Sequence, residues 1–480
     1  MSTTKQPSLI QALIPLLFLI GLLAANVAFY GDNSLGGANQ MALLLSAGVA
    51  SIVALLNGEK WDKLFDGIVA SIGSALPALI ILLMIGALAG TWLISGVVPA
   101  MIYYGLEILS PNIFLFATCI VCAVVSLATG SSWTTVATVG VALMGIGRIL
   151  GFSDGMIAGA IISGAYFGDK MSPLSDTTNL APAMAGTDLI THIKHMMWTT
   201  FPSITIAAIL FLILGFTSGT GADVAGVDSL QHAIASKFDI SLWLFLVPLA
   251  VIGLIVKKVP AVPALLIGAL LGALFAVLFQ PQLINELAAE GVGFWKAAYM
   301  VSVDAMTTDV AIVSGNAVAD ELLSSSGMNG MLGTIWLIIC AMIFGGVMEA
   351  SGMLERLAQS ILKLAKSTGS LIASTAGTCL VFNTTASDQY LAIVVPGRMF
   401  AKEYEKRGLA PENLSRALED SGTVTSALVP WNTCGAYHAG VLGVATGTYL
   451  PFAFFNLISP LMTIFYGYMG WKITQRKAEG

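Results

Sequence analysis

Residues 168–179 read GDKMSPLSDTTN, and residues 422–433 read GTVTSALVPWNT. Each stretch contains a proline and a cluster of hydroxyl or amide side chains, and each interrupts an otherwise apolar part of the chain. Aligning the two stretches also pairs Ser172 with Ser426. Polar interruptions at matching places in two halves of an apolar chain are typical of the broken helices that line a binding site within a membrane.

The composition indicates a membrane protein. Of the 480 residues, 56% are hydrophobic and only 10% are charged, whereas a soluble domain carries about 25% charged residues. Many apolar segments approach the ~20 residues that a helix needs to cross the hydrocarbon core. We therefore predict an all-α polytopic membrane protein with no enzymatic activity, no cofactor and no nucleic-acid partner.

The order of apolar and polar segments divides the chain into two similar halves. Each half is expected to contain a re-entrant hairpin with a polar tip, followed by a broken transmembrane helix. The predicted boundaries are 1–217 for the first repeat, with its hairpin at about 111–150 and its broken helix at about 155–186, 218–239 for an extramembrane linker, and 240–480 for the second repeat, with its hairpin at about 368–402 and its broken helix at about 412–447.

The distribution of charge indicates that the two halves are inverted. Residues 352–416 contain eight Lys and Arg residues, but the corresponding residues 98–162 contain only Arg148. Because positive charge favours the cytoplasmic side, we expect the ends of these two regions on opposite sides of the membrane. Treating each hairpin as re-entrant gives an even number of crossings and predicts that both termini are cytoplasmic.

Acidic residues occur at the predicted membrane depth near the tips and breaks. They are Asp169, Asp176, Asp388 and Asp420. A carboxylate near the bilayer centre costs about 2.5–3.5 kcal/mol even on the lenient insertion scale, so we expect each one to face a cavity, a cation or a partner. Asp176, which is flanked by hydroxyl and amide residues, is the strongest candidate for alternate binding of a proton and an ion.

Three of these carboxylates also have structural interpretations. Lys170 could neutralise the neighbouring Asp169. Asp388 could cap a helix that begins at Gln389. Asp420 lies within its predicted helix and could pair with a basic group. These interpretations stay open on the sequence alone.

A hard alkali cation prefers oxygen ligands, including hydroxyl, amide and free backbone carbonyl groups. Pro173 and Pro430 cannot donate a backbone N–H and disturb the preceding turn, so carbonyls beside them are freed. Ser and Thr in membrane helices also commonly bond their own backbone, and each hydroxyl could do so here. The candidate oxygen donors are Thr129, Ser131, Ser132, Ser175, Thr177, Thr178, Asn179, Asn383, Thr384, Thr385, Asn432 and Thr433.

His438 follows the second polar stretch. Histidine titrates near neutral pH and could relay a proton. A packed, hydrogen-bonded histidine is the more common arrangement, and both interpretations stay open.

Residues 168–182, GDKMSPLSDTTNLAP, resemble the signature of the NhaC family of sodium–proton antiporters. The resemblance extends over most of the chain. It implies a homodimer in a bacterial inner membrane, with Na⁺ and H⁺ as the transported ions. It also implies a scaffold domain and a transport domain, the latter containing the two hairpins and the two broken helices and moving as an elevator.

Two functions are therefore expected. The leading hypothesis is secondary active antiport, in which cytoplasmic Na⁺ leaves as external protons enter and both compete for carboxylates at the tips and breaks. The alternative is a Na⁺/H⁺-coupled organic-anion exchanger of the malate/lactate type, known among relatives in the family. In that case helix N-termini and Lys170 would bind the substrate carboxylate. An ATP-driven pump is not expected, because the sequence contains no P-loop.

Overall fold

The structure is a computed structural model that describes residues 6–30, 36–108, 110–218 and 224–476. The described residues are almost entirely helical, apart from the antiparallel pair of short strands β1 (Val310–Ala311) and β2 (Ser324–Ser325). Seven of the described helices are long and apolar enough to cross a membrane, and up to nine spans result if each of two bent helix pairs counts as one. The chain is therefore a helical, multi-pass membrane protein.

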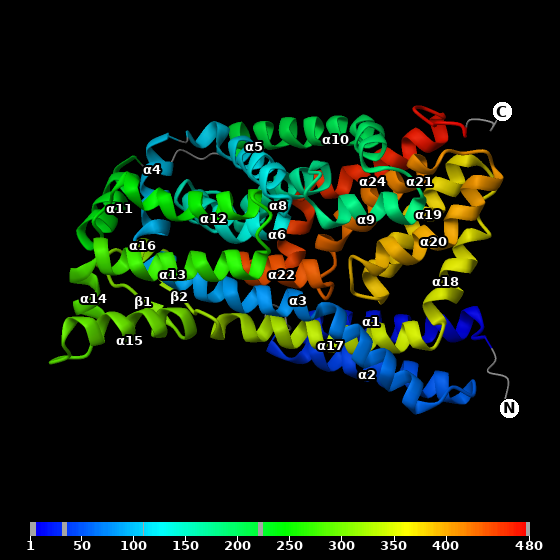
Figure 1. Ribbon diagram of the computed structural model, residues 1–480, viewed down its shortest axis with the longest axis horizontal. Helices are drawn as coiled ribbons and strands as arrows, with labels where there is room; N and C mark the ends of the chain where they lie inside the picture. Colours follow the sequence, from blue (N-terminus) through cyan, green and yellow to red (C-terminus); the bar gives the residue numbers. More distant parts are fainter. Residues whose placement is uncertain (1–5, 31–35, 109, 219–223, 477–480) are drawn as a thin grey trace.

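The helices before residue 219 include α8 and α9, which the first polar stretch joins (Figure 1). Among them, η2 is a π-helical turn. They are α1 (Leu9–Tyr30), α2 (Ala38–Leu56), α3 (Trp61–Ile94), α4 (Val97–Ile108), α5 (Pro111–Thr129), α6 (Ser132–Thr135), η2 (Val136–Gly140), α7 (Val141–Ile149), α8 (Asp154–Met171), α9 (Asp176–Ala185) and α10 (Leu189–Ser218).

The helices after residue 223 include a second π-helical turn, η5, within the second polar region. In chain order they are α11 (Val224–Lys237), η3 (Leu242–Phe245), α12 (Leu246–Val256), α13 (Ala261–Phe279), α14 (Pro281–Leu287), α15 (Phe294–Thr307), α16 (Ala317–Leu322), η4 (Asn329–Met331), α17 (Leu332–Ala350), α18 (Met353–Leu362), α19 (Thr368–Thr385), α20 (Leu391–Lys406), α21 (Pro411–Leu418), η5 (Glu419–Thr423), η6 (Ser426–Leu428), α22 (Thr433–Leu442), α23 (Thr446–Tyr449), η7 (Leu450–Phe452) and α24 (Phe454–Met469).

The segment expected to be a linker is helical beyond residue 223. Residues 219–223 lie outside the described residues, and the remainder forms α11. Leu230, Ile234 and Phe238 recur every four residues and are buried, so α11 presents one apolar face. That face explains how a segment rich in polar residues packs against α4.

Both polar stretches contain a gap between helices. Residues 172–175 separate α8 from α9, and residues 429–432 separate η6 from α22. Pro173 and Pro430 fall within these gaps, in keeping with the missing backbone N–H of proline. The first tip, around residues 129–132, is a short turn, because α5 ends directly before Gly130, whose φ of 70° favours glycine, and α6 begins at Ser132. The second tip, around residues 383–390, lies between α19 and α20.

The first tip and the first break are joined by unusually close helix packing. Gly164 and Gly168 of α8 lie against the backbone of α5. A Cβ atom at Gly164 would come within 2.1 Å of the Cys119 carbonyl oxygen, and one at Gly168 within 2.4 Å of the Ala123 carbonyl oxygen. Only glycine permits this approach, so α5 and α8 pack backbone to backbone.

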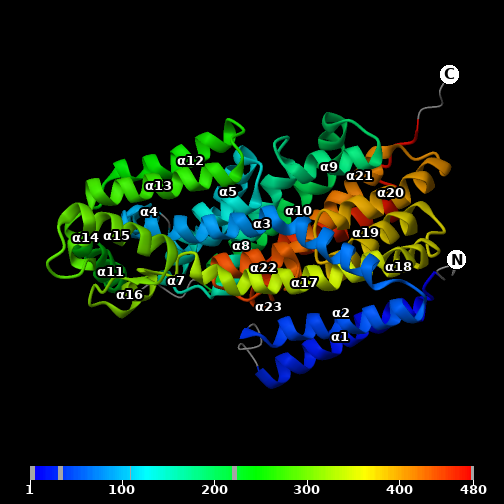
Figure 2. The same cartoon turned by 60° about the horizontal axis from the view of Figure 1, so that its bottom comes forward.

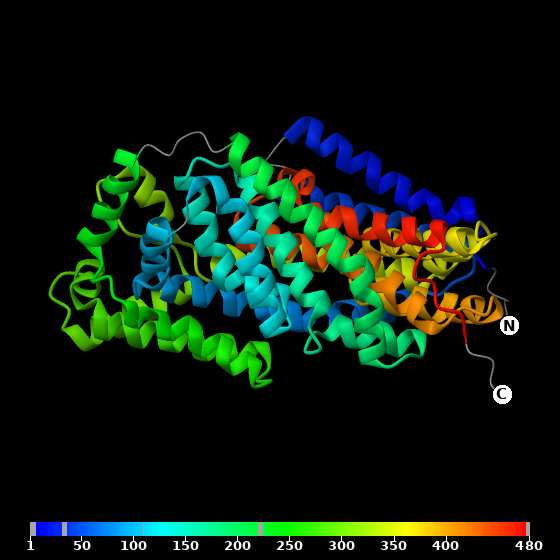
Figure 3. The same ribbon diagram turned by 90° about the horizontal axis from the view of Figure 1, so that it is seen from above.

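The two hairpin regions lie towards opposite ends of the molecule. Figure 2 shows α7 towards the end formed by α11, α14, α15 and α16, and α19 and α20 towards the end where α18 lies. Seen from above, helices α11 to α16 gather at one end, while both ends of the described chain lie at the other (Figure 3).

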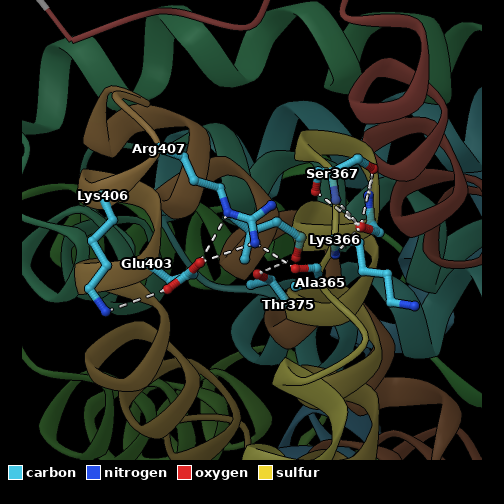
Figure 4. Close-up of polar contacts among 9 residues, drawn as sticks. Ala365, Lys366, Ser367, Thr375, Glu403, Lys406 and Arg407 are labelled. Atoms are coloured by element: carbon cyan, nitrogen blue, oxygen red, sulfur yellow. Dashed lines mark hydrogen bonds and ion pairs between the residues drawn. The ribbon is translucent and has the colours of Figure 1, made fainter.

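The base of the second hairpin is a polar, basic cluster (Figure 4). Arg407 donates hydrogen bonds to the Ala365 carbonyl and to Glu403. Ser367 caps α19 by accepting a hydrogen bond from the Ser370 backbone N–H at 3.2 Å. These bonds satisfy helix-end groups away from the apolar middle of the hairpin.

Candidate functional site

A polar cavity of about 780 Å³ lies where the tips and breaks meet. One wall consists of residues 129–131 of the first tip, 173–177 of the first break and 388–390 of the second tip. Thr433 and Cys434, at the start of α22, complete this wall. The cavity therefore brings together residues from both halves of the chain.

The rest of the lining comes from α3 and from the region where α12 is followed by α13. Ser74 and Pro77 contribute from α3, and residues 258–262 contribute from the loop and the start of α13. Lys258 has a left-handed backbone conformation, with a φ of 63°. Among the described residues that line the cavity, Lys258 is the one basic side chain.

Asp169 is positioned at the end of α8 by the first tip. Its carboxylate oxygen Oδ2 accepts hydrogen bonds from the Ser132 hydroxyl at 2.6 Å and from the Ser132 backbone N–H at 3.1 Å. The side chain is buried in the protein but lines the cavity. Lys170 does not pair with it, because the ammonium group contacts Asp420 instead.

Asp176 is the first residue of α9 and is exposed at the cavity. Its carboxylate makes no hydrogen bond or ion pair with another described residue, and it lines the same cavity as Asp169. The N-terminus of a helix favours negative charge. Two neighbouring carboxylates repel each other unless a proton or a cation is shared between them.

The carbonyls freed by the first break are mostly occupied by neighbouring side chains. The Thr178 hydroxyl donates to the carbonyls of Asp169 and Lys170 at 3.0 and 2.9 Å. The Asn179 amide donates to the carbonyls of Pro173 and Ser175 at 3.0 and 2.7 Å. Thr178 therefore stabilises the break, and it does not line the cavity.

Asp388 caps a helix and also lies in the cavity lining. Its Oδ1 atom accepts a hydrogen bond from the Leu391 backbone N–H at 2.9 Å, which caps α20. The side chain is buried and also lines the cavity. Helix capping and ion binding are compatible, since a carboxylate has acceptor sites beyond the one used by the cap.

The second break is held to the second tip by two asparagines. The Asn383 amide donates to the Gly422 carbonyl at 2.8 Å and to the Thr425 hydroxyl at 2.9 Å. The Asn432 amide in turn donates to both oxygens of Asn383, each at 3.1 Å. Both side-chain amides already use their N–H groups in hydrogen bonds that hold the break in place, and neither residue lines the cavity.

Other hydroxyls of the second tip bond their own helix. Thr384 donates to the carbonyls of Leu380 and Val381, and Thr385 donates to the Val381 carbonyl at 2.6 Å. They lie outside the cavity lining, as does Pro430. The structural interpretation thus applies to both hydroxyls.

Asp420 lies in the π-helical turn η5 rather than in the cavity lining. It pairs with Lys170 at the end of α8, and both side chains are fully buried. Ser459 of α24 joins them, because Lys170 Nζ donates to its hydroxyl at 3.0 Å. The expectation that Asp420 pairs with a basic group is confirmed.

Glu419 is a buried acid that the sequence interpretation missed. It is fully buried in η5, and its Oε1 atom accepts a hydrogen bond from the Thr177 hydroxyl at 3.0 Å. Thr177 belongs to the first break, so this bond joins the two broken regions. Its position beside Asp420 in the same apolar segment was the signal that could have identified it.

His438 connects indirectly to the cavity. Its Nε2 atom lies 3.0 Å from the Tyr166 hydroxyl, which lies 3.4 Å from the Ser426 hydroxyl. Ser426 donates to the side chain of Gln389 at 3.0 Å, and Gln389 lines the cavity. His438 is therefore a packed residue, and it stands at the far end of a series of polar side chains that begins at Gln389 in the cavity lining.

The predicted residues divide into two groups by position. The cavity lining includes Asp169, Asp176, Asp388, Thr129, Ser131, Ser175, Thr177, Asn179, Thr433 and Pro173. It excludes Asp420, Ser132, Thr178, Asn383, Thr384, Thr385, Asn432, Pro430 and His438. No group of three or more His, Cys, Asp and Glu side chains with metal-binding geometry occurs in the described part of the chain, so a bound Na⁺ would need hydroxyl or carbonyl oxygens as well.

A multi-pass helical membrane protein with carboxylates around one internal polar cavity belongs to the class of membrane transporters. Residues 164–471 match the model of the Na⁺/H⁺ antiporter family. The chain belongs to this family, and the resemblance to NhaC antiporters is confirmed. The matched region contains both breaks and the second tip.

Characterised relatives cover nearly the whole chain but differ in substrate. The chain is 40% identical to the Na⁺/H⁺ antiporter NhaC of Alkalihalophilus pseudofirmus, over 85% of this chain and 86% of that protein. It is 37% identical to the malate-2H⁺/Na⁺-lactate antiporter of Bacillus subtilis, over 98% and 96% of the two chains. It is also 37% identical to the arginine/ornithine antiporter ArcD of Halobacterium salinarum, over 99% and 95%. These relatives are antiporters, not enzymes.

Proposed function

We propose that this protein exchanges cytoplasmic Na⁺ for external protons at the cavity between the tips and breaks. The observation that carries the proposal is that the carboxylates of Asp169 and Asp176 line the same cavity. Their mutual repulsion is relieved by binding either a proton or a cation. Competition of the two ions for the same oxygens would couple their movements in opposite directions.

The test is transport by purified protein in lipid vesicles. An imposed Na⁺ gradient is expected to move protons in the absence of any organic acid or amino acid. Asp176→Asn should abolish this movement at unchanged expression, because the amide cannot alternate between a proton and an ion. Proton movement that requires malate, lactate, arginine or ornithine would contradict the proposal, as would near-normal activity of Asp176→Asn.

A second candidate function is exchange of an organic acid coupled to Na⁺ and protons. The volume of about 780 Å³ lies within the range of small-molecule sites, about 300–1,000 Å³, and far exceeds the need of a single ion. Lys258, which lines the same cavity as the acidic groups, could bind a substrate carboxylate. Lys170 is less suited to this role than the sequence suggested, because it is fully buried against Asp420.

The architectural proposals are the two inverted repeats and elevator movement. The arrival of the hairpin regions from opposite ends of the molecule supports the inverted repeats. Different elements form the two parts of the cavity lining, which is compatible with one part sliding past the other. A homodimer held by the scaffold is proposed on family grounds.

We also propose that both termini face the cytoplasm of a bacterial inner membrane. The residues before α1 and after α24 lie at one end of the molecule (Figure 3). The C-terminal segment contacts the base of the second hairpin, since the Ala410 backbone N–H donates to the Thr474 carbonyl at 3.0 Å. That base contains Lys406 and Arg407, and positive charge favours the cytoplasmic side. Lys477 lies outside the described residues.

A further inference from the structure

The π-helical turn η5 contains a second group of buried oxygens behind the cavity. Glu419, Ser421 and Thr423 all belong to this turn and are fully buried. None of the three lines the cavity. π-Helical turns are rare and frequently occur at functional sites.

Several oxygen atoms of this turn lack hydrogen-bond partners among the described residues. They include Glu419 Oε2, Ser421 Oγ and Thr423 Oγ1. Thr423 lies four residues after Glu419 in the same turn, and its hydroxyl is close enough to interact with the Glu419 carboxylate. An ionised carboxylate can only accept hydrogen bonds, and apart from the Thr423 hydroxyl no described residue supplies Glu419 Oε2 with a donor or a cation.

The charges around the turn leave Glu419 without an ion pair. Lys170 lies near Glu419 but pairs with Asp420. Arg416, on the preceding turn, donates to the Lys472 carbonyl at 3.0 Å and acts electrostatically on Asp420. Within the described residues no basic group comes within ion-pair distance of Glu419, and an isolated buried carboxylate is costly.

Thr177 connects this group of oxygens to the cavity. Its hydroxyl donates to Glu419 Oε1 at 3.0 Å and lies 3.2 Å from the Ser175 hydroxyl. Both Ser175 and Thr177 line the cavity. An ion leaving the cavity would therefore meet the Glu419 carboxylate directly behind Thr177.

We propose that Glu419 and Thr423 form a second cation site, separate from the cavity carboxylates and reached from the cavity past Thr177. A carboxylate with hydroxyl oxygens is a hard ligand set that suits an alkali cation. A monovalent ion matches the single negative charge of Glu419. The inference rests on the proposed function for the identity of the ion, which is Na⁺.

Equilibrium binding of radioactive Na⁺ to the purified full-length protein tests the site. Wild-type protein is expected to bind one more Na⁺ per chain than Glu419→Gln, whereas Asp176→Asn keeps the ion that Glu419→Gln loses. Thr423→Val should weaken the affinity of this site about tenfold. Glu286→Gln is the matched control, because Glu286 lies on the surface in an exposed ion pair with Lys237.

Equal Na⁺ binding by Glu419→Gln and Glu286→Gln would overturn the proposal and would indicate that Glu419 is a neutral, structural group. If Glu419→Gln does not fold, Thr423→Val decides, and unchanged affinity in that variant also overturns the site. The result is distinguishable from failure of the proposed function. Normal Na⁺/H⁺ exchange by Asp176→Asn would contradict the proposed role of Asp176 in the cavity. Na⁺ binding at Glu419 is measured in a separate experiment, and that result would not decide it.

Discussion

The two breaks look alike in sequence but use their polar groups differently. In the first break, Asp169, Ser175 and Asp176 face the cavity. In the second, Asn383 and Asn432 bond to each other and to the broken backbone. The second half reaches the cavity mainly through Asp388 and through the start of α22. Matching sequence positions therefore mark matching interruptions of the helix, while most of the polar side chains that line the cavity come from the first half.

The largest expected effect concerns the ion pair that joins the two breaks. Lys170→Met leaves the Asp420 carboxylate buried and unpaired, which should lower the free energy of unfolding by about 3–5 kcal/mol. Thermal unfolding of the detergent-solubilised protein measures the change. Lys237→Met, which removes an exposed pair, should cost less than about 1 kcal/mol, and adding Asp420→Asn to Lys170→Met should restore much of the loss. Equal shifts for the two lysine variants would contradict the assigned role.

The second prediction tests whether carboxylates at the first break bind the transported ions. Asp169→Asn retains an acceptor for Ser132 but removes the charge, so Na⁺-dependent proton movement should fall about 100-fold, or about 2.7 kcal/mol. Vesicle transport and the unfolding temperature are measured together. Thr433→Val, which alters a cavity-lining residue of the second break, should lower the rate far less. A larger loss in Thr433→Val would reverse the comparison between the breaks.

Asn432→Ala tests the structural role of the second break. It removes the bonds to Asn383 and leaves buried polar atoms unsatisfied, which should cost about 1–3 kcal/mol of unfolding free energy. Na⁺ affinity per folded molecule should change little. The control is Asn112→Ala, which removes an exposed amide outside the cavity lining. A loss of Na⁺ affinity without a loss of stability would assign Asn432 to ion binding instead.

The smallest effect is expected at the tip of the second hairpin. Thr384→Val removes a hydroxyl that bonds only its own helix, so stability should change by no more than about 0.5 kcal/mol. Transport should be unaffected. A marked rise in the Na⁺ concentration needed for half-maximal transport would show that this hydroxyl reaches the ion after all.

Much of the fold could be predicted because its signals are local. Apolar segment length predicts membrane helices, and proline with polar neighbours predicts the helix breaks that occur at residues 172–175 and 429–432. The helical packing of α11 was missed, since its apolar residues are diluted by Gly, Ser and Asp. The spacing of apolar residues can indicate which face of such a helix is buried. It does not indicate which other helix covers that face.

The site could be predicted only in part, because side-chain partners depend on contacts between distant segments. The sequence placed Lys170 beside Asp169, but the fold turns its ammonium group to Asp420, 250 residues away. Thr178 and Asn432 have side-chain oxygens of the kind that binds a hard cation. In the structure, however, both side chains form hydrogen bonds that stabilise the broken helices. Glu419 was missed because the sequence does not show that Thr177, 242 residues away, donates a hydrogen bond to it.

The glycine contact between α5 and α8 has a mechanical consequence. Gly164 and Gly168 bring the two backbones so close that neither helix can slide along the other without collision. The first tip, carried by α5, and the first break, carried by α8, therefore form one stiff body. The hydrogen bonds from Ser132 of the tip to Asp169 of α8 would therefore keep their geometry if this body moves relative to the rest of the protein.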